Sequence, residues 1–207
     1  MPVLDIDGHR LRQSLAIIDY LDQTRGLGLL PLDPVQRAKV SGLARRLAMD
    51  VHPICNLPVV RYAAGITGDE TIKGDWMQRF IGPGLTAFET LLTSFKQDPF
   101  CNGSKPGLVD ICLIPQLYNA SRWNASFADC PKICTIAAHC AALPAFADAH
   151  PDRVKPQSNH EGQNAATVRT QCPKPDVRLK TGLTACGSHS TVVGSMSGGT
   201  SQNAGLL

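Results

Sequence analysis

The spacing of apolar residues along the middle of the chain predicts a set of helices. The pair Asp33-Pro34 has the features of a helix start, with an N-cap residue followed by proline at the first helical position. The apolar residues after this pair recur mostly at separations of three, four or eight, which is typical of one face of a long helix. They are Val35, Leu43, Leu47, Val51 and Ile54.

Three more helices are predicted downstream. One carries a second apolar stripe and should kink where Gly82-Pro83-Gly84 interrupts it. Another begins near Gly107, with Asp110 placed where the acid of a capping box reaches back to the helix start. The last runs from about Pro131 to Ala142. The residues of the second stripe are Trp76, Phe80, Phe88, Leu92 and Phe95.

The first 25 residues follow a different pattern. Residues 3–6 are strand-forming, Asp7-Gly8 predicts a turn, and residues 10–11 resume a paired strand. Gln13-Ser14 then opens a helix that continues through residues 15–21. Two short strands and one helix are too little for an independent domain. We therefore expect them to be the end of a larger α/β unit.

Composition separates the end of the chain from the rest. All 11 aromatic residues lie at or before Phe146, and residues 157–207 are rich in Ser, Thr, Gly, Asn and Gln. Such a segment cannot bury enough apolar surface to offset the ~1–2 kcal/mol per residue that backbone ordering costs. We expect residues 157–207 to be disordered, either as a non-functional extension or as a linker or interaction segment.

Charge and hydropathy exclude several classes of function. The net charge is +3 with no basic block, which gives nucleic-acid binding no electrostatic support. No apolar run approaches the ~18 residues of a membrane-spanning helix. The first residues, MPVLDIDGHR, lack the basic and apolar regions of a signal peptide. We therefore expect a cytoplasmic protein that binds neither nucleic acid nor membrane, with its eight cysteines reduced.

A zinc site is one alternative use of these cysteines. Cys130, Cys134, His139 and Cys140 are ligand types that zinc accepts. Structural zinc sites favour closely paired ligands such as C-x2-C, however, and the four residues lack that spacing. We therefore expect no metal.

Several sequence blocks follow one another in the order and spacing of a known family. Residues 50–57, DVHPICNL, resemble a D-I-H-P-x-x-N signature, and residues 107–120 resemble a block A-D-x-x-L-V-P-Q-x-Y-N-A. Three further blocks are Pro2-Val3-Leu4 with Gln13-Ser14 and the helix after it, Leu29-Leu30-Pro31 with Asp33-Pro34, and residues 143–151. Together they cover about three-quarters of the chain. The chain thus resembles the zeta-class glutathione transferases, the maleylacetoacetate and maleylpyruvate isomerase family.

The resemblance implies a mainly α fold in three parts. Residues 1–25 are then the tail end (ββα) of a thioredoxin-like glutathione-binding domain, and residues 33–153 are the all-helical C-terminal domain of a glutathione transferase. Residues 157–207 form the disordered tail. In such folds the strand proline, here Pro2, follows a cis peptide bond.

The same resemblance assigns glutathione as the cofactor and names the residues that bind it. Pro2, Gln13 and Ser14 match one part of the glutathione site. A serine hydroxyl and free N–H groups at a helix N-terminus also suit a carboxylate such as that of the γ-glutamyl group. His52 and Asn56, four residues apart, are expected on one helix face beside the pocket.

Arg122 resembles the family's anchor for a substrate carboxylate, and a guanidinium can hold a carboxylate with two parallel hydrogen bonds. The implied reaction is the glutathione-dependent cis–trans isomerisation of a small unsaturated diacid, maleylacetoacetate or maleylpyruvate, by a homodimer. The family's catalytic serine lies in a segment that would precede Pro2, so no catalytic residue is assigned and we expect little or no activity from residues 1–207. The alternative is a non-catalytic binding or dimerisation module.

Overall fold

The computed structural model describes residues 2–154. The chain divides into two units, residues 1–175 and 176–207, and all the described residues belong to the first. The tail expected at residues 157–207 lies outside the described part of the chain. So does the peptide bond before Pro2, because Met1 is not described.

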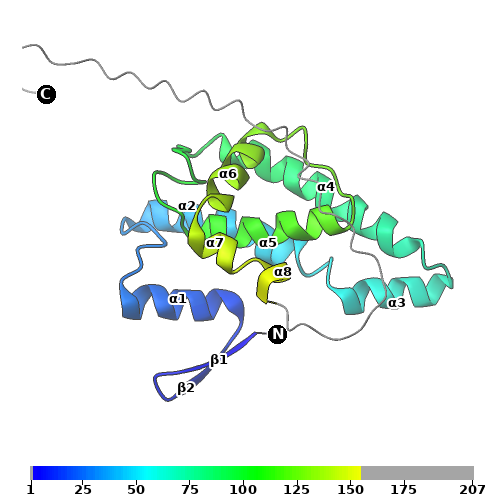
Figure 1. Cartoon of the computed structure of the whole chain (residues 1–207), viewed down its shortest axis with the longest axis horizontal. Coiled ribbons are helices and arrows are strands. Elements are labelled where there is room, and N and C mark those ends of the chain that lie inside the picture. Colours follow the sequence, from blue (N-terminus) through cyan, green and yellow to red (C-terminus); the bar gives the residue numbers. More distant parts are fainter. Residues whose placement is uncertain (1, 155–207) are drawn as a thin grey trace, which may run out of the picture. The chain divides into compact units, whose positions relative to one another are not determined.

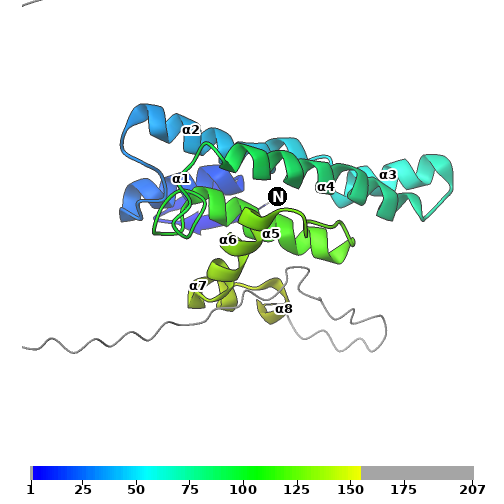
Figure 2. The ribbon, with the colours of Figure 1, turned by 90° about the horizontal axis from the view of Figure 1, so that it is seen from above.

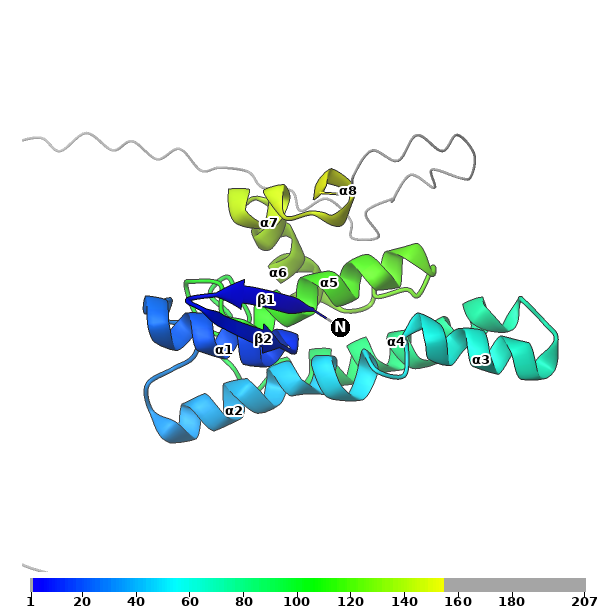
Figure 3. The same ribbon diagram turned by 90° about the horizontal axis from the view of Figure 1, so that it is seen from below.

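The chain begins with a β-hairpin that leads directly into a helix. Strands β1 (Val3–Ile6) and β2 (His9–Arg12) pair antiparallel, in a register that places Val3 opposite Arg12. Asp7 and Gly8 both have positive φ, 51° and 77°, as the tightest two-residue hairpin turns require. Helix α1 (Ser14–Arg25) follows at once and lies beside the hairpin (Figures 1 and 3).

Ionic and polar contacts join the turn of the hairpin to α1. The Tyr20 hydroxyl donates to Asp7 Oδ2 at 2.8 Å, and Arg25 Nη2 lies 2.7 Å from the same oxygen. These contacts lower the pKa of the Asp7 carboxyl, mainly through the Tyr20 hydrogen bond and then through Arg25. These contacts therefore hold the turn of the hairpin against the helix that follows it.

A bundle of helices makes up the rest of the described chain. Figures 2 and 3 show α7 and α8 on the opposite side of α5 and α6 from α2 and α3. The elements are α2 (Pro34–Arg45), η1, a π-helical turn (Arg46–Val51), α3 (Leu57–Thr67), α4 (Ile72–Leu92), α5 (Leu108–Arg122), α6 (Pro131–Ala141), α7 (Pro144–Asp148) and α8 (Pro151–Val154).

The first apolar stripe is only partly buried. Leu43, Leu47 and Val51 are in the core, but Val35 is 60% exposed and Ile54 is 38% exposed. Each helical residue turns the chain by about 100°, so after eight residues the Val35 and Leu43 side chains point roughly 80° apart around the helix. A separation of eight is therefore a poor indicator that two residues share a buried face. The wider π-helical turn of η1 shifts the face again, and the helix ends before Ile54.

Helix α4 runs through Pro83 as a single element. Phe88 and Leu92 are fully buried, as the stripe predicted, whereas Trp76 and Phe80 pack at the edge of the core with ring centroids 5.0 Å apart. Gly84 has a packing role, because a Cβ there would lie 2.7 Å from Val51 Cγ2. The glycine lets η1 and α4 approach closely.

The buried core lies between α2, η1, α4, α5 and α6. Its largest fully buried side chains come from several of these elements, so the core is shared and not confined to one helix pair. They include Phe88, Leu47, Met77, Ile81, Leu85, Leu92, Leu113, Ile133 and Ile136. Among residues 2–154, no helix is both long and apolar enough to cross a membrane.

Carboxylates cap three of the helices. Asp33 caps α2 by accepting from the Gln36 N–H at 2.7 Å. Asp110, only 1% exposed, accepts from the N–H groups of Gly107 at 2.8 Å and Cys101 at 3.0 Å, which fixes both the start of α5 and the loop before it. Glu89 on α4 caps α6 from a distance in the sequence, since its two oxygens accept from Lys132 and Ile133, each at 2.9 Å.

Candidate functional site

The N-terminal end of α1 carries two of the expected glutathione residues. Gln13, the N-cap residue, has φ 72° and ψ 122°, and its side chain does not cap the helix. Such a φ is unusual for a residue other than glycine and typically stores about 1–3 kcal/mol of strain, often at functional sites. Ser14 is the first helical residue, and both side chains are exposed.

The hairpin brings Pro2 close to this end of α1. Because β1 and β2 pair Val3 with Arg12, the residue before β1 reaches the level of the residue after β2, which is Gln13. Pro2 is exposed. The register therefore gathers the three residues expected at one part of the glutathione site.

His52 and Asn56 do not share a helix face, so that expectation was wrong. His52 ends the π-helical turn η1, and its N–H donates to the Leu47 carbonyl at 2.9 Å. Pro53 supplies no N–H to continue the helix. Asn56 has an extended backbone, φ −67° and ψ 135°, and is the N-cap residue of α3. The two exposed side chains flank a turn between two elements.

Arg122, the expected carboxylate anchor, is the last residue of α5 and is exposed. Its guanidinium carbon lies 5.8 Å from the centre of the Tyr118 ring, within the range of a cation–π contact. The Tyr118 hydroxyl donates to Asp152 Oδ1 at 2.7 Å, and the ring meets that of His150 edge-on at 5.3 Å. Residues of α8 and the turn before it thus support the ring beneath Arg122.

The expected site residues fall into three separate groups. Within residues 2–154, no hydrogen bond or ion pair joins the α1 group, the turn at His52 and Asn56, and Arg122. The side chains of each group are therefore exposed to solvent and make no polar contact with the other two groups.

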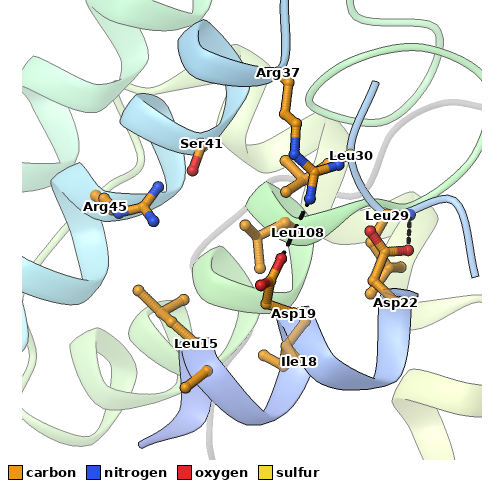
Figure 4. A pocket seen from close by; sticks show the side chains of 11 residues that line it. Leu15, Ile18, Asp19, Asp22, Leu29, Leu30, Arg37, Ser41, Arg45 and Leu108 are labelled. Carbon is orange, nitrogen blue, oxygen red and sulfur yellow. Dashed lines mark hydrogen bonds and ion pairs between the residues drawn. The ribbon is translucent and has the colours of Figure 1, made fainter. Parts of the chain in front are cut away.

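A cavity of about 290 Å³ lies between α1 and α2, next to the α1 group. Leu15 and Ala16, which directly follow Ser14, belong to its wall. Figure 4 shows Ser41 and Arg45 on the α2 side and Leu15, Ile18 and Asp19 on the α1 side. The remaining wall comes from Asp22, Leu29, Leu30, Arg37 and Leu108.

Sequence reasoning did not identify this cavity. The signal was present in the spacing of Arg37, Ser41 and Arg45, which are four residues apart and so share one face of α2. What the sequence does not show is that α1 lies opposite that face, since this depends on packing between elements.

The buried cysteines have no nucleophilic role at neutral pH. Burial raises the pKa of the Cys55 and Cys112 thiols to about 11 and that of Cys140 to about 12, so all three stay protonated. Burial likewise raises the pKa of Cys101. Among the described residues, Cys55, Cys112 and Cys140 therefore offer no thiolate at neutral pH.

Five described cysteines have free thiols, whereas Cys134 is disulfide-bonded, which differs from the expectation of reduced thiols. The four residues of the zinc alternative do not form a site in the described chain. Over residues 2–154, no three His, Cys, Asp or Glu side chains come together as a group that could hold a metal ion.

Comparisons with known proteins place this geometry in a family. No family model matches the chain. A maleylacetoacetate isomerase from Rhizobium meliloti (strain 1021) is 52% identical over 158 residues, which are 75% of this chain and 74% of the relative. An alignment of this length at this identity indicates common descent, with the alignment covering most of both proteins.

Solved structures agree with the sequence relatives. Maleylpyruvate isomerase from Pseudomonas aeruginosa PAO1 has a TM-score of 0.70 and 41% identity, covering 75% of this chain and 83% of that chain. Maleylacetoacetate isomerase from Anaeromyxobacter dehalogenans 2CP-1, with dicarboxyethyl glutathione and citrate bound in its active site, has a TM-score of 0.68 and 35% identity over 75% of this chain and 70% of that one. The chain therefore belongs to the glutathione-dependent maleylacetoacetate and maleylpyruvate isomerase family of zeta-class glutathione transferases.

Proposed function

We propose that this chain binds glutathione at the N-terminal end of α1 and acts in the glutathione-dependent cis–trans isomerisation of maleylacetoacetate or maleylpyruvate. The observation that carries the proposal is the α1 start, where strained Gln13 leaves the first helical turn without a side-chain cap and exposes Ser14. Free N–H groups, the helix dipole and a hydroxyl together favour a bound carboxylate. Glutathione supplies one in its γ-glutamyl group.

The reaction needs a thiolate and a means of holding a diacid. In the family's chemistry the glutathione thiolate adds to the cis double bond, the resulting single bond rotates, and elimination releases the trans product and the thiolate. The dicarboxyethyl glutathione bound in the Anaeromyxobacter enzyme is a thioether of this kind, with two carboxylates on the added group. Arg122, on its support of Tyr118, is suited to hold one such carboxylate.

The remaining roles follow from position. Pro2 lies level with Gln13 and completes the α1 group, while His52 and Asn56 offer a ring and an amide from the turn before α3. We assign five residues to glutathione, namely Pro2, Gln13, Ser14, His52 and Asn56, and we assign Arg122 to the substrate. No residue of this chain is assigned to activation of the thiol. Because Arg122 would hold either diacid, both substrates belong to the proposal.

Calorimetric titration of residues 1–207 with glutathione tests the first part of the proposal. We expect binding that Ser14→Ala weakens about tenfold, because one hydrogen bond to a charged group contributes roughly 1.5–3 kcal/mol. Ser94→Ala removes an exposed serine hydroxyl far along the chain, beyond α4, and should leave the affinity unchanged. Equal affinities for the wild-type chain and Ser14→Ala would contradict the assignment.

An isomerisation assay on the same protein separates the two candidate functions. Glutathione-dependent conversion of maleylacetoacetate by residues 1–207 would establish the isomerase. Glutathione binding with no conversion would favour a non-catalytic binding or dimerisation module of the same family. Absence of both binding and conversion would contradict the isomerase and any module that binds glutathione.

A further inference from the structure

The cavity between α1 and α2 has one cationic group that no carboxylate of the described chain neutralises. Arg37 Nη2 lies 3.2 Å from Asp19 Oδ1, so this pair is satisfied across the cavity. Asp22 is 8% exposed, and its Oδ1 accepts from the Leu29 N–H at 2.8 Å. Within residues 2–154, Arg45 forms no ion pair. Its guanidinium is therefore available to an incoming anion.

The surroundings of Arg45 define the kind of anion. Ser41 lies one helical turn away on the same face of α2 and brings a hydroxyl to the same side of the cavity (Figure 4). A carboxylate is planar and matches the fork of a guanidinium, with the serine hydroxyl as a further donor. Asp19 and Asp22 also bring two carboxylates to the cavity, and Arg37 is already paired with Asp19. A second negative charge on the ligand would therefore be repelled.

The other walls are apolar. Leu15 and Ile18 from α1, Leu29 and Leu30 from the loop before α2, and Leu108 at the start of α5 contribute side chains to the cavity. A volume of about 290 Å³ is at the lower limit of small-molecule sites. It suits a ligand with a short hydrocarbon or aromatic body and one acidic group.

We propose that this cavity binds a small organic monocarboxylate, with its carboxylate on Arg45 and Ser41 and its apolar body against the leucine wall. The site is separate from the proposed glutathione and diacid contacts, because it uses none of the residues assigned to them. Arg45 is exposed, so solvent and salt screen its charge and the affinity should be modest, on the order of millimolar.

A two-dimensional NMR titration of the full chain with benzoate tests the proposal. We expect saturable shifts for backbone amides of α1 and α2 near the cavity, and weaker binding when sodium chloride is added. Benzamide has nearly the same shape without the charge and should bind at least about tenfold more weakly. Saturable binding of benzamide with the affinity of benzoate would overturn the proposed carboxylate recognition.

Two neighbouring arginines provide a matched pair of variants. Arg45→Gln should weaken benzoate binding about tenfold or more, whereas Arg46→Gln, which removes a charge paired with Asp50 at 2.7 Å outside the cavity, should leave it unchanged. Ser41→Ala should give a smaller loss. Failure of benzoate to bind, or equal losses in the two arginine variants, would overturn the proposal.

Failure of the proposed carboxylate site can be distinguished from failure of the proposed glutathione site. Ser14→Ala should impair glutathione binding and leave benzoate binding intact, and Arg45→Gln should do the reverse. Displacement of benzoate by glutathione in direct competition would show a single site and would also overturn the proposal.

Discussion

At the scale of single residues, burial or exposure of a side chain determines whether it can react with or bind a ligand. The described free cysteines are held as neutral thiols by burial, whereas the residues assigned to ligands are exposed: Gln13, Ser14, His52, Asn56 and Arg122. Sequence motifs nominate these residues as ligand contacts, and the structure places each of them where an element begins or ends. It did not reveal that Tyr118 and Asp152 support Arg122, since those contacts cross from α5 to α8.

The thiol of Cys55 makes stability depend on alkaline pH. Burial raises its pKa from 9.0 to about 11, so the unfolded chain loses this proton at a lower pH than the folded chain. The contribution of this thiol to stability is therefore complete below pH 9 and is lost as the pH rises from about 9 to about 11. We expect the urea midpoint to fall across this window.

Cys55→Ala provides the comparison for that experiment. The variant should be less stable below pH 9, because it leaves a small cavity, but its midpoint should fall less steeply between pH 9 and pH 11. The slope and not the absolute stability is the measured quantity, since burial also raises the pKa of Cys112 to about 11 and that of Cys140 to about 12. Identical slopes for the variant and the wild-type chain would contradict the prediction.

At the scale of elements, the sequence predicted turns and helix caps formed by neighbouring residues, but it did not reveal caps formed between distant elements. Asp7-Gly8, Asp33 and Asp110 all act within a few residues of their partners, and each formed the turn or cap that the sequence predicted. Glu89 caps α6 from α4, a partnership that depends on how two helices pack. No local pattern identifies it.

The error at His52 and Asn56 has a physical cause that the sequence contained. A separation of four implies a shared face only if the helix is continuous, and Pro53 between them cannot donate the hydrogen bond that continuity needs. The π-helical turn η1 has no comparable local signal in the sequence.

Substitution of the carboxylate that caps α5 should lower the stability of the fold more than most single substitutions. Asp110→Ala removes the acceptor for two N–H groups, those of Gly107 and Cys101, at a position that is 1% exposed. We expect a loss of about 3 kcal/mol in the free energy of unfolding, measured by urea denaturation. Asp33→Ala, at the exposed cap of α2, should cost only about 1 kcal/mol. Equal losses in the two variants would contradict this account of Asp110.

At the scale of the whole molecule, apolar residues exposed on η1, the turn after it and α3 are candidate contacts for the homodimer that the resemblance implies. Exposed apolar side chains on neighbouring elements are candidates for contact with a partner chain. The residues of this η1–α3 surface, with their exposed fractions, are Met49 (59%), Ile54 (38%), Leu57 (42%), Tyr62 (74%) and Ile66 (70%).

Light scattering coupled to size-exclusion chromatography tests the homodimer. We expect the wild-type chain to elute with the mass of two chains. The double variant Tyr62→Glu/Ile66→Glu places two charges one turn apart on α3 and should elute as a monomer. Leu91→Glu, at a 44% exposed position on α4, should remain a dimer. A monomeric wild-type chain would contradict the proposal.

Calorimetric titration of residues 1–207 with dicarboxyethyl glutathione, alongside glutathione itself, separates the proposed diacid contact from the proposed glutathione contacts. We expect Arg122→Gln to weaken binding of the dicarboxyethyl compound about tenfold and to leave glutathione binding unchanged, because Arg122 is assigned to the diacid alone. Arg79→Gln, an exposed arginine on α4, serves as the control for loss of charge. Equal effects of Arg122→Gln on both ligands, or no binding of either ligand to the wild-type chain, would contradict the account.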